Sequence, residues 1–322
     1  MSVGVLCAVL AAAFLHALWN ALIKVGTSKL GGMVILSLTE IPIGLAVAAT
    51  RPWPAPQVWP WVIAAGCTHF CYKFFLTTAY DRGDLSRVYP IARGAAPMVV
   101  AIVGAATLAD AVSHWEYAGI AVLGAGILWM ARGVFTAGEE RRMLPFALGS
   151  ACATATYTMI DGLGARVAGD AAGYVAWVFV ADGLIFSSLM IGWRGVAIIP
   201  RDARSWGLAG FASAASYGAY AVSIWAMTVA PIAVVAALRE TSILFAVLIG
   251  WLVFGERMDR GKMIAAGLIV IGVMLTRLYV QRRPPSCFAL VCLWVLNIPA
   301  GGSDPTTRAF GGEFEGTLKT VQ

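Results

Sequence analysis

The sequence predicts an all-α polytopic membrane protein whose ten transmembrane helices form two inverted five-helix repeats. Three observations predict this fold. Of the 322 residues, 60% are hydrophobic and only 12% are charged, with a mean hydropathy of +0.79, whereas soluble domains carry roughly 25% charged residues. The apolar residues gather into segments long enough to cross a bilayer. Several of the few charged residues inside these segments recur at matching positions in the two halves.

The apolar segments are defined by length, since a helix needs about 20 residues to cross the hydrocarbon. The first segment follows Met1-Ser2 directly, without a basic leader or a clear cleavage site, which favours a retained span over a signal peptide. The connecting segments are too short to hold a soluble domain. The predicted spans are 3–25, 31–49, 58–80, 86–108, 114–131, 144–163, 172–193, 206–229, 231–254 and 262–280.

A polar segment, 132–143, divides these spans five and five. After residue 280 the composition changes, and the single apolar stretch of the tail is too short to span. We therefore predict a first repeat at 1–135, a polar linker at 136–143, a second repeat at 144–280 and a poorly ordered tail at 281–322.

The two halves repeat at a slowly drifting offset. The offset is 146 positions for Arg93 with Arg239, Gly104 with Gly250 and Asp110 with Glu256, 142 for Glu40 with Asp182, and 138 for Trp19 with Tyr157. A one-way drift is expected of two diverged copies with small insertions. Because each copy has an odd number of spans, the copies would enter the membrane from opposite faces, related by a pseudo-two-fold axis in its plane.

This pattern resembles the EamA branch of the drug/metabolite transporter superfamily. The resemblance rests on the five-plus-five division, the opening His16-Ala-Leu-Trp-Asn20, the segment GDLSRVYPIARG at 83–94, and helix-end acids followed by glycine in the next helix. It covers residues 1–280. It implies transport of a small metabolite through a central cavity, while Asp110 departs from the glutamate more usual at its position.

Arg93 and Arg239 lie roughly 6–8 Å from the predicted membrane midplane, at 1.5 Å per residue. In inverted copies they approach from opposite faces, and paired guanidinium groups form a forked donor site for a carboxylate, phosphate or phosphonate. The alternative is that each arginine pairs with a carboxylate and holds helices together. Glu40 and Asp182 are the expected partners in that case, and they are also the candidate proton carriers.

Further candidates for the cavity wall are His16, Asn20, His69 and Tyr217. His16 and Asn20 share one helix face, and His69 and Lys73 repeat that spacing. His16 could equally be a hydrogen-bonded packing residue, and Lys73 either pairs with an acid or extends to the membrane boundary. Tyr217 could line a pocket or serve in packing. Asp161 is interpreted mainly as a helix-end residue.

Several functional classes are disfavoured. The net charge of +6 comes from scattered loop residues rather than a basic stripe, so no nucleic-acid partner is expected. No P-loop, metalloprotease, hydrolase or zinc-binding spacing occurs, so we expect no cofactor, no metal and no enzymatic activity. An intramembrane enzyme, a channel and a non-transporting scaffold remain the alternatives to a secondary transporter working by alternating access.

The expected surroundings follow from these predictions. The partners are the lipid bilayer and a small polar or anionic solute, with the protein acting as a monomer or homodimer in a bacterial plasma membrane. Basic loop residues place both termini outside, whereas the family resemblance implies that both are cytoplasmic.

Overall fold

The structure, a computed structural model, describes residues 1–25, 29–82, 85–108, 110–131, 141–253 and 260–277. These residues form helices joined by short turns, and none of them lies in a strand. The helices belong to one unit, Met1–Val280. The predicted tail, most of the predicted linker, and Glu256 lie outside the described residues, so the structure leaves these predictions as they stand.

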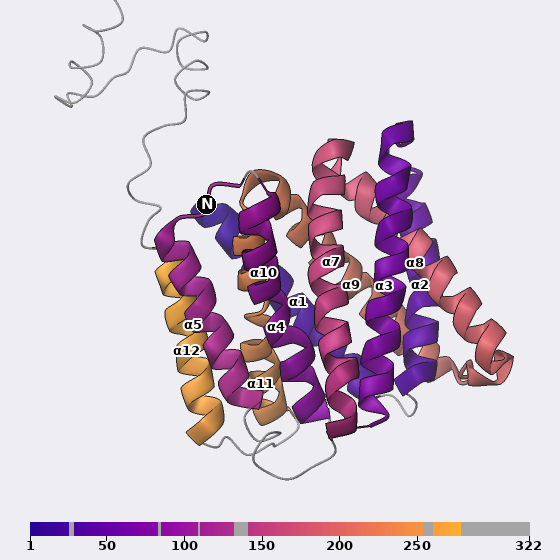
Figure 1. Cartoon of the computed structure of the whole chain (residues 1–322). Coiled ribbons are helices and arrows are strands. Elements are labelled where there is room, and N and C mark those ends of the chain that lie inside the picture. The colour runs from indigo at the N-terminus through magenta and orange to yellow at the C-terminus, as the bar shows by residue number, and fades with distance from the viewer. Residues whose placement is uncertain (26–28, 83–84, 109, 132–140, 254–259, 278–322) are drawn as a thin grey trace, which may run out of the picture. The chain divides into compact units, whose positions relative to one another are not determined.

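The helices follow the apolar segments closely, and every predicted span except 231–254 coincides with a single helix (Figure 1). Their bounds are α1 Val3–Val25, α2 Lys29–Ala48, α3 Trp59–Tyr80, α4 Leu85–Thr107, α5 His114–Ala131, α7 Leu144–Ala168, α8 Ala171–Arg194, α9 Ala203–Val229, α10 Ile232–Arg239, α11 Ser242–Leu252 and α12 Arg260–Arg277.

The predicted span over 231–254 is interrupted, because α10 ends at Arg239 and α11 begins at Ser242, although Ile232–Ile249 together are long and apolar enough to cross a membrane. At the break the backbone tightens to three-residue hydrogen bonds, from the amides of Glu240 and Thr241 to the carbonyls of Ala237 and Leu238. The Thr241 hydroxyl also donates to the Leu238 carbonyl, at 2.7 Å. Hydroxyl groups of this kind compete with the regular helical ladder.

Each helix of the first half packs against helices of the second half. The closest pairs are α1 with α9, α2 with α8, α3 with α7 and α5 with α12, and α5 and α12 can be followed side by side in Figure 1. Two pairs depend on glycine for their close approach. A Cβ at Gly183 of α8 would lie 2.6 Å from the Ser37 carbonyl, and one at Gly119 of α5 would lie 2.7 Å from the Gly272 carbonyl. Small residues allow such contacts between membrane helices.

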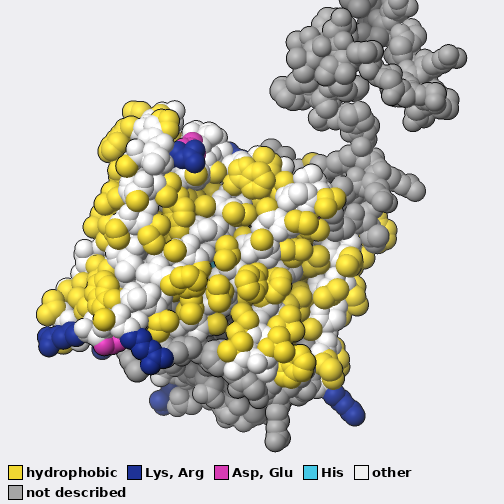
Figure 2. Space-filling model, turned by 180° about the vertical axis from the view of Figure 1, so that it is seen from behind, with side chains coloured by type: hydrophobic (Ala, Val, Ile, Leu, Met, Phe, Trp, Pro, Cys, Tyr) yellow, Lys and Arg dark blue, Asp and Glu magenta, His cyan; other side chains and the backbone are white. Residues whose placement is uncertain are grey.

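The outer surface of the bundle is apolar. Large hydrophobic side chains such as Ile63, Ile102, Phe211 and Met274 are more than half exposed, and Figure 2 shows charged side chains only near the upper and lower edges of the face in view. Among the described residues, four segments are long and apolar enough to cross a membrane: Val3–Leu22, Leu30–Ala48, Ala171–Arg194 and Ile232–Ile249. Such a surface suits lipid better than water.

Candidate functional site

Lys73 joins three helices deep inside the bundle. Its Nζ lies 3.0 Å from Glu40 Oε2 of α2 and 2.5 Å from Asp182 Oδ2 of α8, and it donates to Ser37 Oγ at 2.7 Å. All four residues are buried. An ammonium group so far from water needs such partners, since a buried charge without them is strongly unfavourable. Lys73 therefore pairs with acids, one of the two possibilities left open by the sequence.

The expected pairing of Glu40 and Asp182 with the two arginines is wrong, because both carboxylates bind Lys73. The glycine-mediated approach of α2 and α8 brings the acids together, and α3 packs against α8, so its lysine reaches both. The side chain of Arg93 lies outside the described part of the structure.

Asp161 is the centre of a second buried group. Its side chain is 0% exposed and lies inside α7. Tyr174 of α8 donates to Oδ1 at 3.0 Å, Tyr220 of α9 donates to Oδ2, and Nε2 of His69 lies 2.9 Å from Oδ2. The interpretation of Asp161 as a helix-end residue is therefore wrong.

The error over Asp161 has an identifiable source. Gly162 and Gly164 suggested a helix end, but α7 continues to Ala168, and Gly169 ends it at φ +70° with its amide bound to the Ala165 carbonyl. A glycine in this left-handed conformation is a common helix terminator. The later glycine was the signal that would have placed Asp161 in the helix interior.

His69 connects the two groups. Its Nε2 faces Asp161, and its Nδ1 lies 3.9 Å from Asp182 Oδ2. Glu40, Lys73, Asp182, His69 and Asp161 thus form one continuous series across α2, α3, α7 and α8, which we call the buried charge network. Its members come from both halves of the chain.

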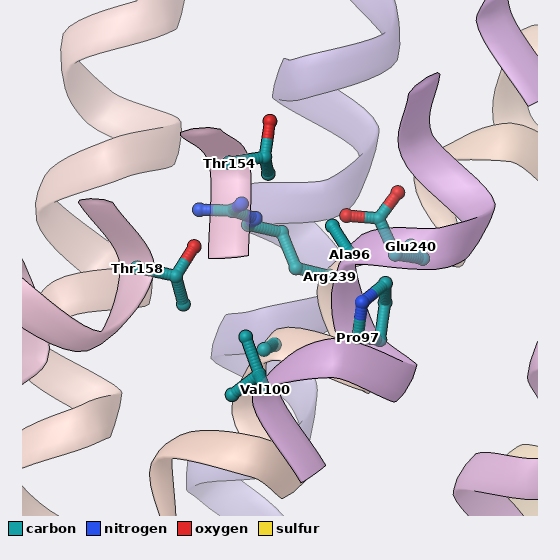
Figure 3. A pocket seen from close by; sticks show the side chains of 8 residues that line it. Ala96, Pro97, Val100, Thr154, Thr158, Arg239 and Glu240 are labelled. Carbon is teal, nitrogen blue, oxygen red and sulfur yellow. The ribbon is translucent and has the colours of Figure 1, made fainter. Parts of the chain in front are cut away.

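Arg239 lies beside this network in a tight pocket. Its Nη2 is 3.4 Å from the Tyr157 hydroxyl, and its guanidinium carbon is 5.9 Å from the ring centres of both Tyr157 and Tyr220. In Figure 3 the guanidinium extends toward the gap between Thr154 and Thr158. The pocket is lined by Ala96, Pro97, Val100, Thr154, Thr158, Ala236, Arg239 and Glu240.

The pocket is polar but small. The buried Thr154 hydroxyl has no hydrogen-bond partner among the described residues, although most other helix threonines bond a backbone carbonyl. The pocket has about 0 Å³ of space for a water molecule, whereas ligand pockets hold roughly 300–1,000 Å³. The helices are therefore closed around this site.

The remaining candidates make local contacts. On α1, the Trp19 indole donates to His16 Nδ1 at 3.3 Å, and the Asn20 amide donates to the His16 carbonyl at 2.7 Å. Tyr217 is half-buried and donates to the Ala172 carbonyl, at the start of α8. These contacts tie the three residues to neighbouring backbone and rings.

A separate ion pair lies beyond the end of α4. Arg166 of α7 binds both oxygens of Asp110, at 2.7 and 3.0 Å, and also donates to the carbonyls of Met227 and Ala230 at the end of α9. Asp110 in turn accepts the first amide of α10, that of Ile232, at 2.9 Å. This clamp joins four segments of the chain, a role that the sequence did not indicate for Arg166.

Comparison with known proteins identifies the second half of the chain. The model of the EamA-like transporter family matches residues 141–278. These residues belong to the EamA-like transporter family, a part of the drug/metabolite transporter superfamily. The resemblance drawn from the sequence is confirmed for these residues. EamA-like proteins are polytopic integral membrane proteins, and members of the family are transporters rather than enzymes.

Solved structures share the fold of this chain. One, described only as "Crystal structure of protein", is 18% identical to this chain, with a TM-score of 0.69 over 85% of this chain and 98% of its own. At this identity the likeness shows the fold alone. None of the curated proteins searched matches the sequence.

Proposed function

We propose that this protein is a proton-coupled secondary transporter that moves a small polar or anionic metabolite across a bacterial plasma membrane by alternating access. The moving parts would be the two inverted five-helix halves, residues 1–135 and 144–280. The observation that carries the proposal is the buried charge network, because charged groups inside a membrane bundle are costly and mark solute or proton pathways. The network contains residues of both halves. Alternating access requires a site of this kind, between the parts that move.

The helix packing supports the inverted repeat. In the repeat, α1, α2, α3 and α5 of the first half correspond to α7, α8, α9 and α12 of the second. A two-fold axis would therefore make the contact of α1 with α9 equivalent to that of α7 with α3, and both contacts are present. It would also pair α2 with α8 and α5 with α12, and these pairs are in contact too. Glu40 and Asp182, which match in the sequence repeat, meet at the same lysine. Equivalent residues converge in this way beside a pseudo-two-fold axis.

The charge balance supports proton coupling. With every carboxylate ionised and His69 neutral, Glu40, Asp182 and Asp161 contribute three negative charges against two positive charges, that of Lys73 and that of the adjacent Arg239. Excess charge in a low-dielectric interior is unfavourable, so the network is stabilised by taking up a proton. Release of that proton on the other side of the membrane would link the pH gradient to transport.

The pocket at Arg239 supports a polar or anionic solute. A guanidinium group binds a carboxylate or phosphate with two parallel hydrogen bonds, and the Thr154 hydroxyl offers a further group without a partner. Because the helices are closed around the pocket, a solute would enter only after the halves rearrange. This behaviour is expected of an occluded transporter.

Transport can be tested in two stages. Anionic metabolites would first be screened for those that raise the unfolding temperature of the purified protein, since a ligand of the folded form stabilises it by mass action. A solute found in this way should then show counterflow in proteoliposomes and be recovered chemically unchanged. Arg239→Gln should abolish its uptake, while Arg204→Gln, at the exposed start of α9, serves as the charge-matched control.

Other results would contradict the proposal. Conversion of the solute to a product would indicate an enzyme. Flux without counterflow would indicate a channel. Normal uptake by Arg239→Gln would remove the pocket from the solute pathway.

A further inference from the structure

His69 occupies an unusual place in the buried charge network, between two carboxylates that come from different helices. One ring nitrogen faces Asp161 at 2.9 Å, and the other faces Asp182 at 3.9 Å. We propose that His69 carries the coupled proton and that Tyr220 relays its protonation state to Arg239, an inference that rests on proton-coupled transport as proposed above. Proton loading then favours binding of an anion, so that both are carried in the same direction.

The geometry favours His69 over the carboxylates as the proton carrier. Asp182 Oδ2 and Glu40 Oε2 already accept the Lys73 ammonium, whereas Asp182 Oδ1 is buried and has no hydrogen-bond partner in the described part of the bundle. In a neutral His69 whose Nε2 carries the hydrogen, Nε2 donates to Asp161. Nδ1 is then a hydrogen-bond acceptor, and the group that it faces, Asp182 Oδ2, is an acceptor as well. A proton on Nδ1 gives an imidazolium group that lies between two carboxylates, with Nε2 2.9 Å from Asp161 and Nδ1 3.9 Å from Asp182.

Among the described residues, the charged and titratable groups around His69 come from six helices. They are Lys73 on α3, Glu40 on α2, Asp161 and Tyr157 on α7, Asp182 and Tyr174 on α8, Tyr220 on α9, and Arg239 on α10. Among these groups the three acids outnumber the two cations, Lys73 and Arg239.

Tyr220 connects this site to the pocket. Its hydroxyl lies 3.2 Å from His69 Nε2 and donates to Asp161, while its ring faces the Arg239 guanidinium. Loss of the His69 proton leaves Asp161 without a neighbouring positive charge, and its field then draws Arg239 away from an incoming anion. Tyr174 binds the other oxygen of Asp161 from α8. The two tyrosines therefore form a matched pair for comparison.

Proton loading is measured by currents after a pH jump in proteoliposomes on a solid-supported membrane, with no solute added. We expect a current from the unsubstituted protein and at least a tenfold smaller one from His69→Gln. No current from the unsubstituted protein overturns proton coupling itself, and this inference with it. A full current from His69→Gln overturns only the assignment of the proton to His69.

A second measurement leaves His69 in place, in case His69→Gln does not fold. The chain has only three histidines, so imidazole nitrogen NMR resolves them, and His16→Gln and His114→Gln assign the His69 signal by elimination. That signal should change from neutral imidazole to imidazolium over the pH range of the currents. A ring that stays neutral throughout this range overturns the proposal.

The relay is tested by infrared difference spectra between the two pH values, with labelled arginine. The unsubstituted protein should show a guanidinium band shift that Arg239→Lys removes. Tyr220→Phe should abolish this shift, and Tyr174→Phe should preserve it. Equal behaviour of the two phenylalanine variants overturns the role of Tyr220.

Discussion

The buried charge network and the Asp110–Arg166 clamp are both ion-pair sites that join several helices, yet they differ in charge balance. The Lys73 and Asp182 side chains are 7% and 3% exposed, and Arg166 and Asp110 are 29% and 16% exposed. In the clamp one arginine meets one acid, and their other groups bond backbone carbonyls and an amide. The network has three acids for one lysine. The clamp is satisfied as it stands, whereas the network needs a further positive charge.

This difference supports the proposal that the clamp is a structural site and the network a functional one. A neutral, fully hydrogen-bonded pair at the end of the bundle holds chain segments together whatever the pH gradient. An unbalanced site in the interior changes its energy whenever a proton or an ion arrives. The comparison predicts a graded series of effects, which decrease as the substituted site becomes more balanced and more exposed.

The largest effect is expected for Lys73→Met. It leaves Glu40 and Asp182 buried without a cation, so the free energy of unfolding should fall by about 3–5 kcal/mol, and transport should be lost. Thermal unfolding in detergent measures the first effect. The triple variant with Glu40→Gln and Asp182→Asn should recover stability but not transport. Equal stability of the single variant and the unsubstituted protein would contradict the ion-pair assignment.

Asp182→Asn should have a smaller effect on folding and a selective effect on coupling. The amide keeps an acceptor for Lys73 and removes one excess negative charge, so the protein should fold while the response of transport to a pH gradient weakens about fivefold or more. Uptake with and without an imposed gradient measures this ratio. Ser187→Ala, on the same helix, serves as the control. An unchanged gradient response would clear Asp182 of a role in coupling.

Arg166→Gln tests the clamp. It removes a charged donor from Asp110 and from two carbonyls, so we expect a loss of about 1–3 kcal/mol in stability. Because the clamp lies away from the network, pH coupling should be unchanged. Combining Arg166→Gln with Asp110→Asn should cost less than the sum of the single changes. Strictly additive losses in the double-mutant cycle would show that the pair does not interact.

The smallest effect is expected at Asp202, which caps α9 by accepting the Ser205 amide at 2.8 Å. Hydrogen bonds from Ser205 lower the pKa of this exposed carboxyl below its ordinary value of 3.8. The folded state therefore binds the proton less readily than the unfolded state. The cap contributes above the ordinary pKa and is lost as the pH falls through the lower folded value. In Asp202→Asn, the free energy of unfolding should therefore depend slightly less on pH over that range. A stronger dependence on pH than in the unsubstituted protein would contradict this.

The sequence by itself determined the membrane character, the number and bounds of most spans, and the family of the second half. These features depend on composition and local apolar length, which add along the chain and need no knowledge of neighbouring helices. The residues Glu40, Asp182 and Arg239 were found for the same reason, because charges inside apolar segments are rare.

The tertiary structure decided which charges meet. Any nearby cation could neutralise Glu40 and Asp182, and only the packing of α2, α3 and α8 selected Lys73 over the arginines. Asp161 gained its role from Tyr174, Tyr220 and His69, which approach it from three other helices. The break after Arg239 escaped hydropathy because apolar residues continue on both sides of it. Contacts between helices depend on distances across the bundle, and these are not encoded in any local pattern.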